Sequence, residues 1–293
     1  MSTCTDCDFH LYADDTVLYC IADSAELAVT KLQLAFNSLQ NALVELRLVL
    51  NAGKTKFILF SRSTISDSDI PTIKSVTGST IERVFEYKYL GIWLDAKLSF
   101  NFHISDLVSK LRQKLGFLYS KKSYFPISCR KEIIEATFLS VMDYGDTIYR
   151  SAASSLLKRL DTVYHSALRW ITGDPYGTHR CVLYEGSGLP SLTERRDKHW
   201  YLFLFKAISG MLPAYICSML EPCNTTYLTR SSDLIMLKVP RALTELGKTA
   251  FSVNGPASWN LLQKSLKLTA LPSIGQFKGL LHNTFPHECT CFS

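Results

Sequence analysis

The sequence predicts an α+β chain made of more than one compact unit. Short runs of aromatic and β-branched residues near the N-terminus are separated by turn residues, which is typical of strands. Apolar residues recur at three- and four-residue spacing over residues 24–48 and 100–172, which is typical of amphipathic helices. The chain has 293 residues, and at about 150 residues per domain this is enough for two hydrophobic cores.

Composition excludes two other classes of protein. Disordered chains combine low hydrophobicity with high net charge, whereas 47% of this chain is apolar and its formal net charge is +6. The longest strongly apolar run, residues 200–205, is far shorter than the roughly 18 residues of a membrane span, so we expect no membrane partner. The nine cysteines are interpreted as reduced thiols of an intracellular protein, in the nucleus or the cytoplasm.

The chain is expected to begin with a β-hairpin and a long helix. Residues 9–12 (FHLY) and 16–20 (TVLYC) read as two strands with a short polar turn between them. Asp23 and Glu26 then resemble a capping box, with Asp23 as the cap. Apolar residues at helical spacing follow, so we expect a helix over residues 24–48 that packs on one face only.

Further strands should follow this helix. Residues 56–60 (KFILF) predict a strand, and residues 61–79 form a connection rich in Ser, Thr and Asp. Residues 87–94 (YKYLGIWL) predict a strand pair broken at Gly91.

The pattern then becomes helical. Three helices are expected as a bundle, the first over residues 104–121, the second over 129–145 and the third over 153–171, which stops at Gly173. The remaining chain is expected to hold a helix over 191–209, a strand over 234–239, and short helices over 256–266 and 273–284.

The positive charge is concentrated in one segment. Residues 97–131 hold eight basic residues and one acidic residue, a charge of +7, so the rest of the chain sums to −1. On a helical wheel Lys110, Lys114 and Lys121 fall within about 40° of one another, beside the apolar stripe. Such a row suits nucleic-acid phosphates, because each neutralised phosphate releases counterions. A solvated lysine-rich face is the alternative, and from charge alone both stay open.

Asp14 and Asp15 are the candidate chemical site. Two carboxylates at a hairpin tip offer hard oxygen ligands, and Mg²⁺ is the usual cation where carboxylates and phosphates share a site. The alternative is a solvated turn, which is the commoner role of adjacent aspartates.

The order of the motifs resembles one known family. Tyr12-Ala-Asp-Asp is followed by a long helix, then by residues 50–56 (LNAGKTK) and 87–95 (YKYLGIWLD). This series is similar to the reverse transcriptases of LINE-type (non-LTR) retrotransposons. Residues 159–173, 212–215 and 250–260 look like the C-terminal region of vertebrate elements of that class, so the resemblance covers nearly the whole chain.

The resemblance implies a role for each motif. Asp14 and Asp15 would match motif C of the family, with Asp14 as the more direct Mg²⁺ ligand. Lys54 would match the motif D lysine, which protonates the leaving pyrophosphate or neutralises its charge. The turn of Tyr89, Leu90 and Gly91 would match the primer grip.

The same resemblance implies an architecture and partners. Residues 1–98 would be a partial palm with motifs C, D and E, residues 99–175 a helical thumb-like domain, and residues 176–293 a small mixed C-terminal domain. The partners would be an RNA template and a DNA primer. The row of Lys110, Lys114 and Lys121 would follow the template-primer backbone.

Some parts of the family's polymerase are not found in these residues. Nucleotidyl transfer uses two metal ions bridged by carboxylates from different strands, and the sequence lacks motif A, motif B and the fingers. We therefore expect an RNA-directed DNA polymerase fragment that is inactive alone, with an exposed edge beside the hairpin and an under-covered apolar face on the helix over 24–48. A missing N-terminal half that acts in trans would be a further partner, and the sequence leaves open whether one is supplied. The alternatives are a non-catalytic nucleic-acid-binding remnant and a truncated element copy without function.

Overall fold

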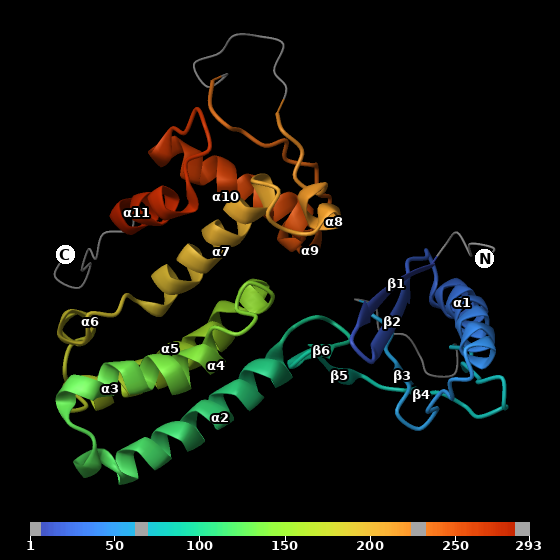
Figure 1. Ribbon diagram of the computed structural model, residues 1–293, viewed down its shortest axis with the longest axis horizontal. Helices are drawn as coiled ribbons and strands as arrows, with labels where there is room; N and C mark the ends of the chain where they lie inside the picture. The colour runs from blue at the N-terminus through green and yellow to red at the C-terminus, as the bar shows by residue number, and fades with distance from the viewer. Residues whose placement is uncertain (1–6, 62–69, 224–232, 285–293) are drawn as a thin grey trace. The chain divides into compact units, whose positions relative to one another are not determined.

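The computed structural model describes residues 7–61, 70–223 and 233–284. The chain divides into two compact units, Met1–His103 and Ile104–Ser293. Strands occupy the first unit and helices dominate the second (Figure 1), so the α+β fold class is confirmed. None of the described helices combines the length and the apolar character that a membrane-spanning segment needs.

The first unit is built from three small sheets and one long helix. Its elements are β1 (Cys7–Tyr12), β2 (Asp15–Cys20), α1 (Ala25–Glu45), β3 (Lys56–Phe57), β4 (Glu82–Arg83), β5 (Glu86–Tyr89) and β6 (Ile92–Asp95). β1 pairs with β2 and β5 with β6, both antiparallel, whereas β3 and β4 form a short parallel pair. Both predicted hairpins are therefore present. The strand expected over residues 56–60 is shorter than predicted, because only Lys56 and Phe57 find a partner strand.

Helix α1 carries the core of the first unit. Val29 and Phe36 are buried in a cluster with Ile70, Ile73 and Ile81. This cluster joins α1 to the segment that follows residue 69, so α1 packs on one face, as its spacing predicts.

The start of α1 corrects one sequence prediction. The cap is Ser24, whose side-chain oxygen accepts a hydrogen bond from the Leu27 N–H at 3.2 Å. Asp23 therefore does not fill the capping position. Ser and Asp are about equally good caps, so the sequence alone could not choose between the two neighbours.

The second unit is helical in its described residues. Helix α2 begins at the boundary between the units, and the elements are α2 (Asn101–Ser120), η2 (Lys122–Tyr124), α3 (Ile127–Ile134), η3 (Glu135–Leu139), α4 (Ser140–Met142), η4 (Tyr149–Ser151), α5 (Ser154–Thr172), α6 (Arg180–Ser187), α7 (Leu192–Ile208), α8 (Ala214–Cys217), α9 (Glu245–Thr249), α10 (Phe251–Leu266) and α11 (Ile274–Thr284). The predicted helix over 129–145 is found as α3, a π-helical turn η3 and α4. Helix α5 ends at Thr172 and is capped by Gly173, which adopts a left-handed φ of 84°, as the predicted stop requires.

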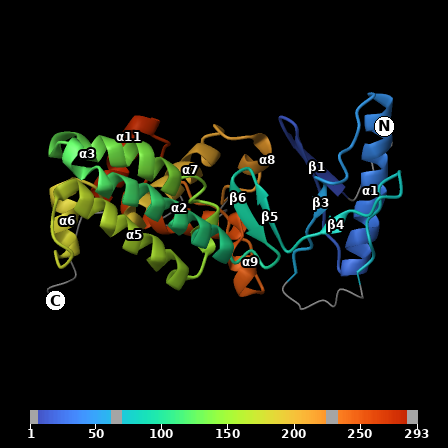
Figure 2. The ribbon, with the colours of Figure 1, turned by 90° about the horizontal axis from the view of Figure 1, so that it is seen from below.

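Helices α2 and α5 lie side by side in both views (Figures 1 and 2). The Trp170 indole N–H donates to the Leu118 carbonyl at 3.0 Å, and the Tyr119 hydroxyl donates to the Ser166 carbonyl at 2.9 Å. Trp170 is fully buried. These two bonds tie the C-terminal ends of the helices together.

A separate cluster of buried residues lies among α7, α10 and α11. Phe205 and Phe277 stack with ring centroids 4.3 Å apart, and Trp259 is fully buried beside them. A Cβ added at Gly255 would lie only 3.2 Å from a methyl carbon of Leu204. The absence of a side chain at this position therefore lets α10 pack closely on α7.

The prediction of a strand over residues 234–239 is wrong. Leu237 forms only an isolated bridge with Pro222. Its N–H donates to Asn260 Oδ1 at 2.8 Å, and its carbonyl accepts from Asn260 Nδ2 at 2.7 Å. The Trp259 indole N–H donates to the Ile235 carbonyl at 2.7 Å. Side chains of α10 thus replace the second strand that this segment would otherwise need.

Candidate functional site

Asp14 and Asp15 lie at the turn of the first hairpin. Tyr12 pairs with Asp15 across the strands, so Ala13 and Asp14 are the two turn residues and Asp15 begins β2. Both aspartates are exposed. Ala13 has a left-handed φ of 52°, a conformation that costs about 1–2 kcal/mol for a residue with a Cβ. The turn that presents the two carboxylates is therefore strained.

The carboxylate pair fits a divalent metal only in part. Asp14 and Asp15 offer hard oxygen donors on the surface, which is the donor type that Mg²⁺ prefers. Among the described residues, no third Asp, Glu, His or Cys joins them in a group that could hold an ion. A complete metal site at the hairpin would need further ligands.

The other predicted palm residues lie on two different loops of the same unit. Lys54 is exposed in the turn before β3, and its N–H donates to Asn51 Oδ1 at 3.1 Å. Leu90 and Gly91 are the turn residues between β5 and β6, with φ values of 44° and 85°, which is the pattern of a tight type I′ hairpin turn. The convergence of these loops on one reaction centre stays a prediction.

The predicted basic row lies on α2 and in the residue that follows it. Lys110, Lys114 and Lys121 are exposed, while Leu111 and Leu115 on the adjacent face are buried. Lys110 forms an ion pair with Asp106 at 2.6 Å, with 45% of the lysine side chain exposed. Phe117, 62% exposed, falls in the same row by helical spacing. The lysines therefore lie on the surface beside the buried face, as predicted.

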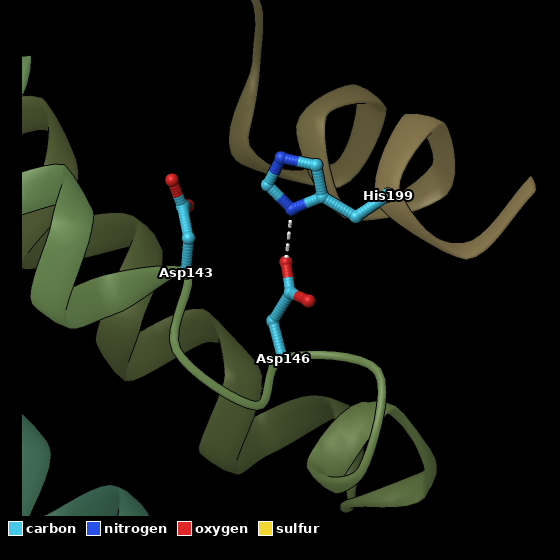
Figure 3. Close-up of side chains that lie close together, drawn as sticks. All are labelled: Asp143, Asp146 and His199. Carbon is cyan, nitrogen blue, oxygen red and sulfur yellow. Dashed lines mark hydrogen bonds and ion pairs between the residues drawn. The ribbon is translucent and has the colours of Figure 1, made fainter. Parts of the chain in front are cut away.

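A second group of ligand-type side chains was missed by the sequence reasoning. Asp143, Asp146 and His199 bring one ligand atom each to within 4.8 Å of one another. Figure 3 shows His199 of α7 above the segment that follows α4, with its Nδ1 2.5 Å from Asp146 Oδ2. Asp146 is buried. The two segments are 53 positions apart in sequence, and no spacing motif connects them.

Ion pairs surround this group. Arg195 Nε contacts Asp143 Oδ1 at 2.8 Å, and Arg150 Nη1 contacts Asp197 Oδ1 at 2.6 Å. Residues 195, 197 and 199 of α7 thus each contact the segment of residues 143–150. Both aspartates of the ligand-type group already have a partner, so its evident role is to fasten α7 to this segment.

Burial shifts the titration of neighbouring groups. Burial, and next the charge of Asp146, raise the pKa of Tyr149 well above its ordinary value. The Tyr149 hydroxyl donates to the Met142 carbonyl at 2.5 Å. Burial opposes the charge on Arg195, but hydrogen bonding to Asp143 and the charge of that residue outweigh it, so the pKa of Arg195 is raised. Tyr149 therefore stays neutral and Arg195 charged, which suits a structural link.

The sequence of this chain is similar to those of several known proteins. No family model and no solved structure matches the chain. The RNA-directed DNA polymerase from mobile element jockey of Drosophila melanogaster is 29% identical over 168 residues, which is 56% of this chain and 18% of that protein. A probable RNA-directed DNA polymerase from transposon BS of the same fly is 26% identical over 191 residues, 64% of this chain and 21% of the relative.

A third relative extends the same pattern. The probable RNA-directed DNA polymerase from transposon X-element of Drosophila melanogaster is 29% identical over 115 residues, 38% of this chain and 13% of the relative. The chain thus spans about a fifth or less of the curated relatives that it matches. Its homologues are RNA-directed DNA polymerases of non-LTR retrotransposons, which confirms the resemblance that its motifs predict.

Proposed function

We propose that this chain supplies the motif C hairpin, the primer grip and the thumb of an RNA-directed DNA polymerase, and that α2 holds the template-primer duplex. The observation that carries the proposal is the exposed row of Lys110, Lys114 and Lys121 beside the buried face of α2. The similarity to polymerases of mobile elements supports the same assignment.

The basic row suits a duplex because it is regular. Lys110, Lys114 and Lys121 repeat at one-turn and two-turn intervals along one flank of the helix. Contacts to phosphates follow backbone shape and carry no sequence information, which a polymerase requires because it copies any template. On binding, Lys110 would exchange its ion pair with Asp106 for a phosphate.

The palm residues have separate roles in this proposal. A Mg²⁺ ion would supply Lewis-acid activation of the primer hydroxyl and neutralise charge on the triphosphate. Asp14 would be its more direct ligand and Asp15 the supporting one. Lys54 would give a proton to the pyrophosphate or neutralise its charge. The turn of Tyr89, Leu90 and Gly91 would hold the primer end.

The experiment measures binding of a fluorescent RNA–DNA hybrid by anisotropy over a salt series. Reversing Lys114 and Lys121 to Glu should weaken binding and lower the magnitude of the salt slope by about two, because each lost phosphate contact removes about one counterion. Lys264→Glu with Lys278→Glu on α10 and α11 changes the net charge equally and serves as the control. An equal loss in both double variants, or no loss in either, would contradict the proposal.

Primer extension tests the carboxylate pair. The assay uses the 293-residue chain with oligo(dT) on poly(A) and Mg²⁺. We expect no incorporation, because the described residues bring no third ligand group to Asp14 and Asp15 and nucleotidyl transfer uses two ions. Incorporation that Asp14→Asn abolishes would show instead that the chain polymerises alone.

A further inference from the structure

The opposite flank of α2 carries a second, chemically different surface. Arg112, Gly116 and Tyr119 are spaced one and two turns apart, and on a helical wheel they fall on the far side of the buried stripe from Lys110 and Lys114. This flank faces α5, to which the Tyr119 hydroxyl donates a hydrogen bond at the Ser166 carbonyl.

A cavity of about 240 Å³ lies between α2 and α5 on this flank. Leu115 and Val163 give it an apolar floor, Thr162 and Ser166 add hydroxyl groups, and Arg112 and Tyr119 complete its wall. A Cβ added at Gly116 would meet nothing within 4 Å, so the entrance is open. The volume is below the roughly 300–1,000 Å³ of pockets for whole drug-sized ligands, which suits one flat group of a larger molecule.

Helix α5 continues beyond the cavity with Arg169, which lies about one turn after the cavity-lining Ser166. The Arg169 guanidinium lies 4.9 Å from the ring centroid of Tyr176, and Tyr176 is 88% exposed. Burial raises the pKa of Tyr119, and the charge of Arg169 acts in the opposite direction. We call Arg112, Tyr119, Arg169 and Tyr176 together the arginine–tyrosine surface.

We propose that the arginine–tyrosine surface binds an unpaired nucleic-acid strand, with one base in the cavity and the next stacked on Tyr176. Guanidinium groups neutralise phosphates, and aromatic rings stack on any base, so a surface that holds both Arg and Tyr is suited to single strands. A duplex cannot use such rings, because its bases already stack on one another. An acidic peptide would use the two arginines but would make no use of the exposed ring of Tyr176.

The inference rests on the proposed function in one respect: the strand is the unpaired template that adjoins the duplex held by the basic row. The two flanks of α2 then have distinct ligands. Lys110, Lys114 and Lys121 take paired backbone, and the arginine–tyrosine surface takes unpaired bases. The two assignments can therefore fail separately.

The test compares two fluorescent probes, a 12-nucleotide single-stranded RNA and an RNA–DNA hybrid. Tyr176→Ala should weaken single-strand binding by about tenfold, the size expected for the loss of one stacked base. Arg112→Gln should lower the magnitude of the single-strand salt slope by about 0.7. Both side chains are exposed, and circular dichroism and thermal melting confirm folding of each variant.

Controls separate the outcomes. Tyr215→Ala removes an exposed tyrosine of α8, 55% exposed, and Lys264→Gln removes a charge from α10, outside both surfaces. Neither should weaken single-strand binding as Tyr176→Ala does. Equal losses on hybrid and single strand for Tyr176→Ala, or no loss on either, would overturn the inference. So would competition by poly-glutamate as effective as that by unlabelled RNA. If reversal of Lys114 and Lys121 leaves hybrid binding unchanged while Tyr176→Ala still weakens single-strand binding, the proposed function fails and this inference stands.

Discussion

Arg195 contacts both carboxylate oxygens of Asp143. Its Nε lies 2.8 Å from Oδ1 and its Nη2 lies 2.5 Å from Oδ2. The two side chains are 22% and 18% exposed, so the pair is shielded from most of the solvent. A planar guanidinium donates two parallel bonds to a carboxylate, which lysine cannot do. This pair therefore fixes the orientation of α7 against the residues after α4.

Arg195→Ala should destabilise the chain more than loss of a surface ion pair does. A double-mutant cycle with Asp143→Asn should give a coupling free energy of about 2 kcal/mol, because removing either partner leaves a poorly hydrated charge behind. Arg195→Lys should retain only part of this coupling free energy. The matched control is the exposed pair of Lys248 and Glu245, where urea unfolding should show a coupling of about 0.5 kcal/mol or less. Equal coupling in the two pairs would contradict this account.

Acid should destabilise the fold through His165. Burial, and then the charges of Arg180 and Arg169, lower the pKa of His165 from 6.5 to about 4. The unfolded state then binds the proton more readily, so stability is full above pH 6.5 and falls as the pH drops toward 4. At pH 5 the loss should be about 2 kcal/mol relative to pH 7.5.

Urea unfolding at pH 7.5 and pH 5.0 measures this effect. His165→Gln should reduce the difference in unfolding free energy between the two pH values by most of that amount. His282→Gln, at an exposed position of α11, should leave the difference unchanged. An unchanged pH dependence in His165→Gln would show that other groups cause the acid sensitivity.

Short-range sequence patterns correctly predicted two hairpin turns and the long helix α1. The turn between β1 and β2, the Leu90-Gly91 turn and α1 are all present close to their expected bounds. Turn chemistry and helical spacing act within a few residues, so the sequence shows them directly. The exposed lysines of α2 follow from the same spacing, because the buried stripe fixes which flank faces solvent.

Contacts between distant segments could not be predicted in this way. The pairing of Asp146 with His199 depends on how α7 packs against the segment after α4, and no periodicity encodes that distance. The apolar pattern at 234–239 favours a strand, but Asn260 takes the backbone bonds of Leu237. Tertiary contacts therefore overrode local propensity at this position.

Asn260→Ala should loosen the segment around Leu237. The variant loses both hydrogen bonds to the Leu237 backbone, and Leu237 is only 3% exposed, so water replaces the bonds poorly. The cost should be about 2 kcal/mol, with faster hydrogen exchange at the Leu237 amide. Asn254→Ala is the control. The hydrogen bond found for the Asn254 side chain is with Ser258, one turn along the same helix. A loss of the same size in Asn254→Ala would show that the segment is held by other contacts.

The first hairpin should promote association between chains. Within the described residues β1 pairs with β2 alone, and Phe9 and Leu11 of β1 are each 64% exposed. On α1, Leu34 and Val44 are exposed as well, at 56% and 68%, so the open edge and the under-covered apolar face expected from the sequence are both present. An open strand edge beside apolar side chains is a template for pairing with another chain.

Phe9→Lys should therefore raise the concentration at which light scattering first detects oligomers, by several fold, with no loss of stability, because the side chain packs little in the folded monomer. Leu243→Lys is the matched control. It adds the same charge at a side chain that is 86% exposed outside any strand. If association depended only on net charge, the two variants would behave alike. A selective effect of Phe9→Lys assigns the association to the hairpin edge, and equal effects would refute that assignment.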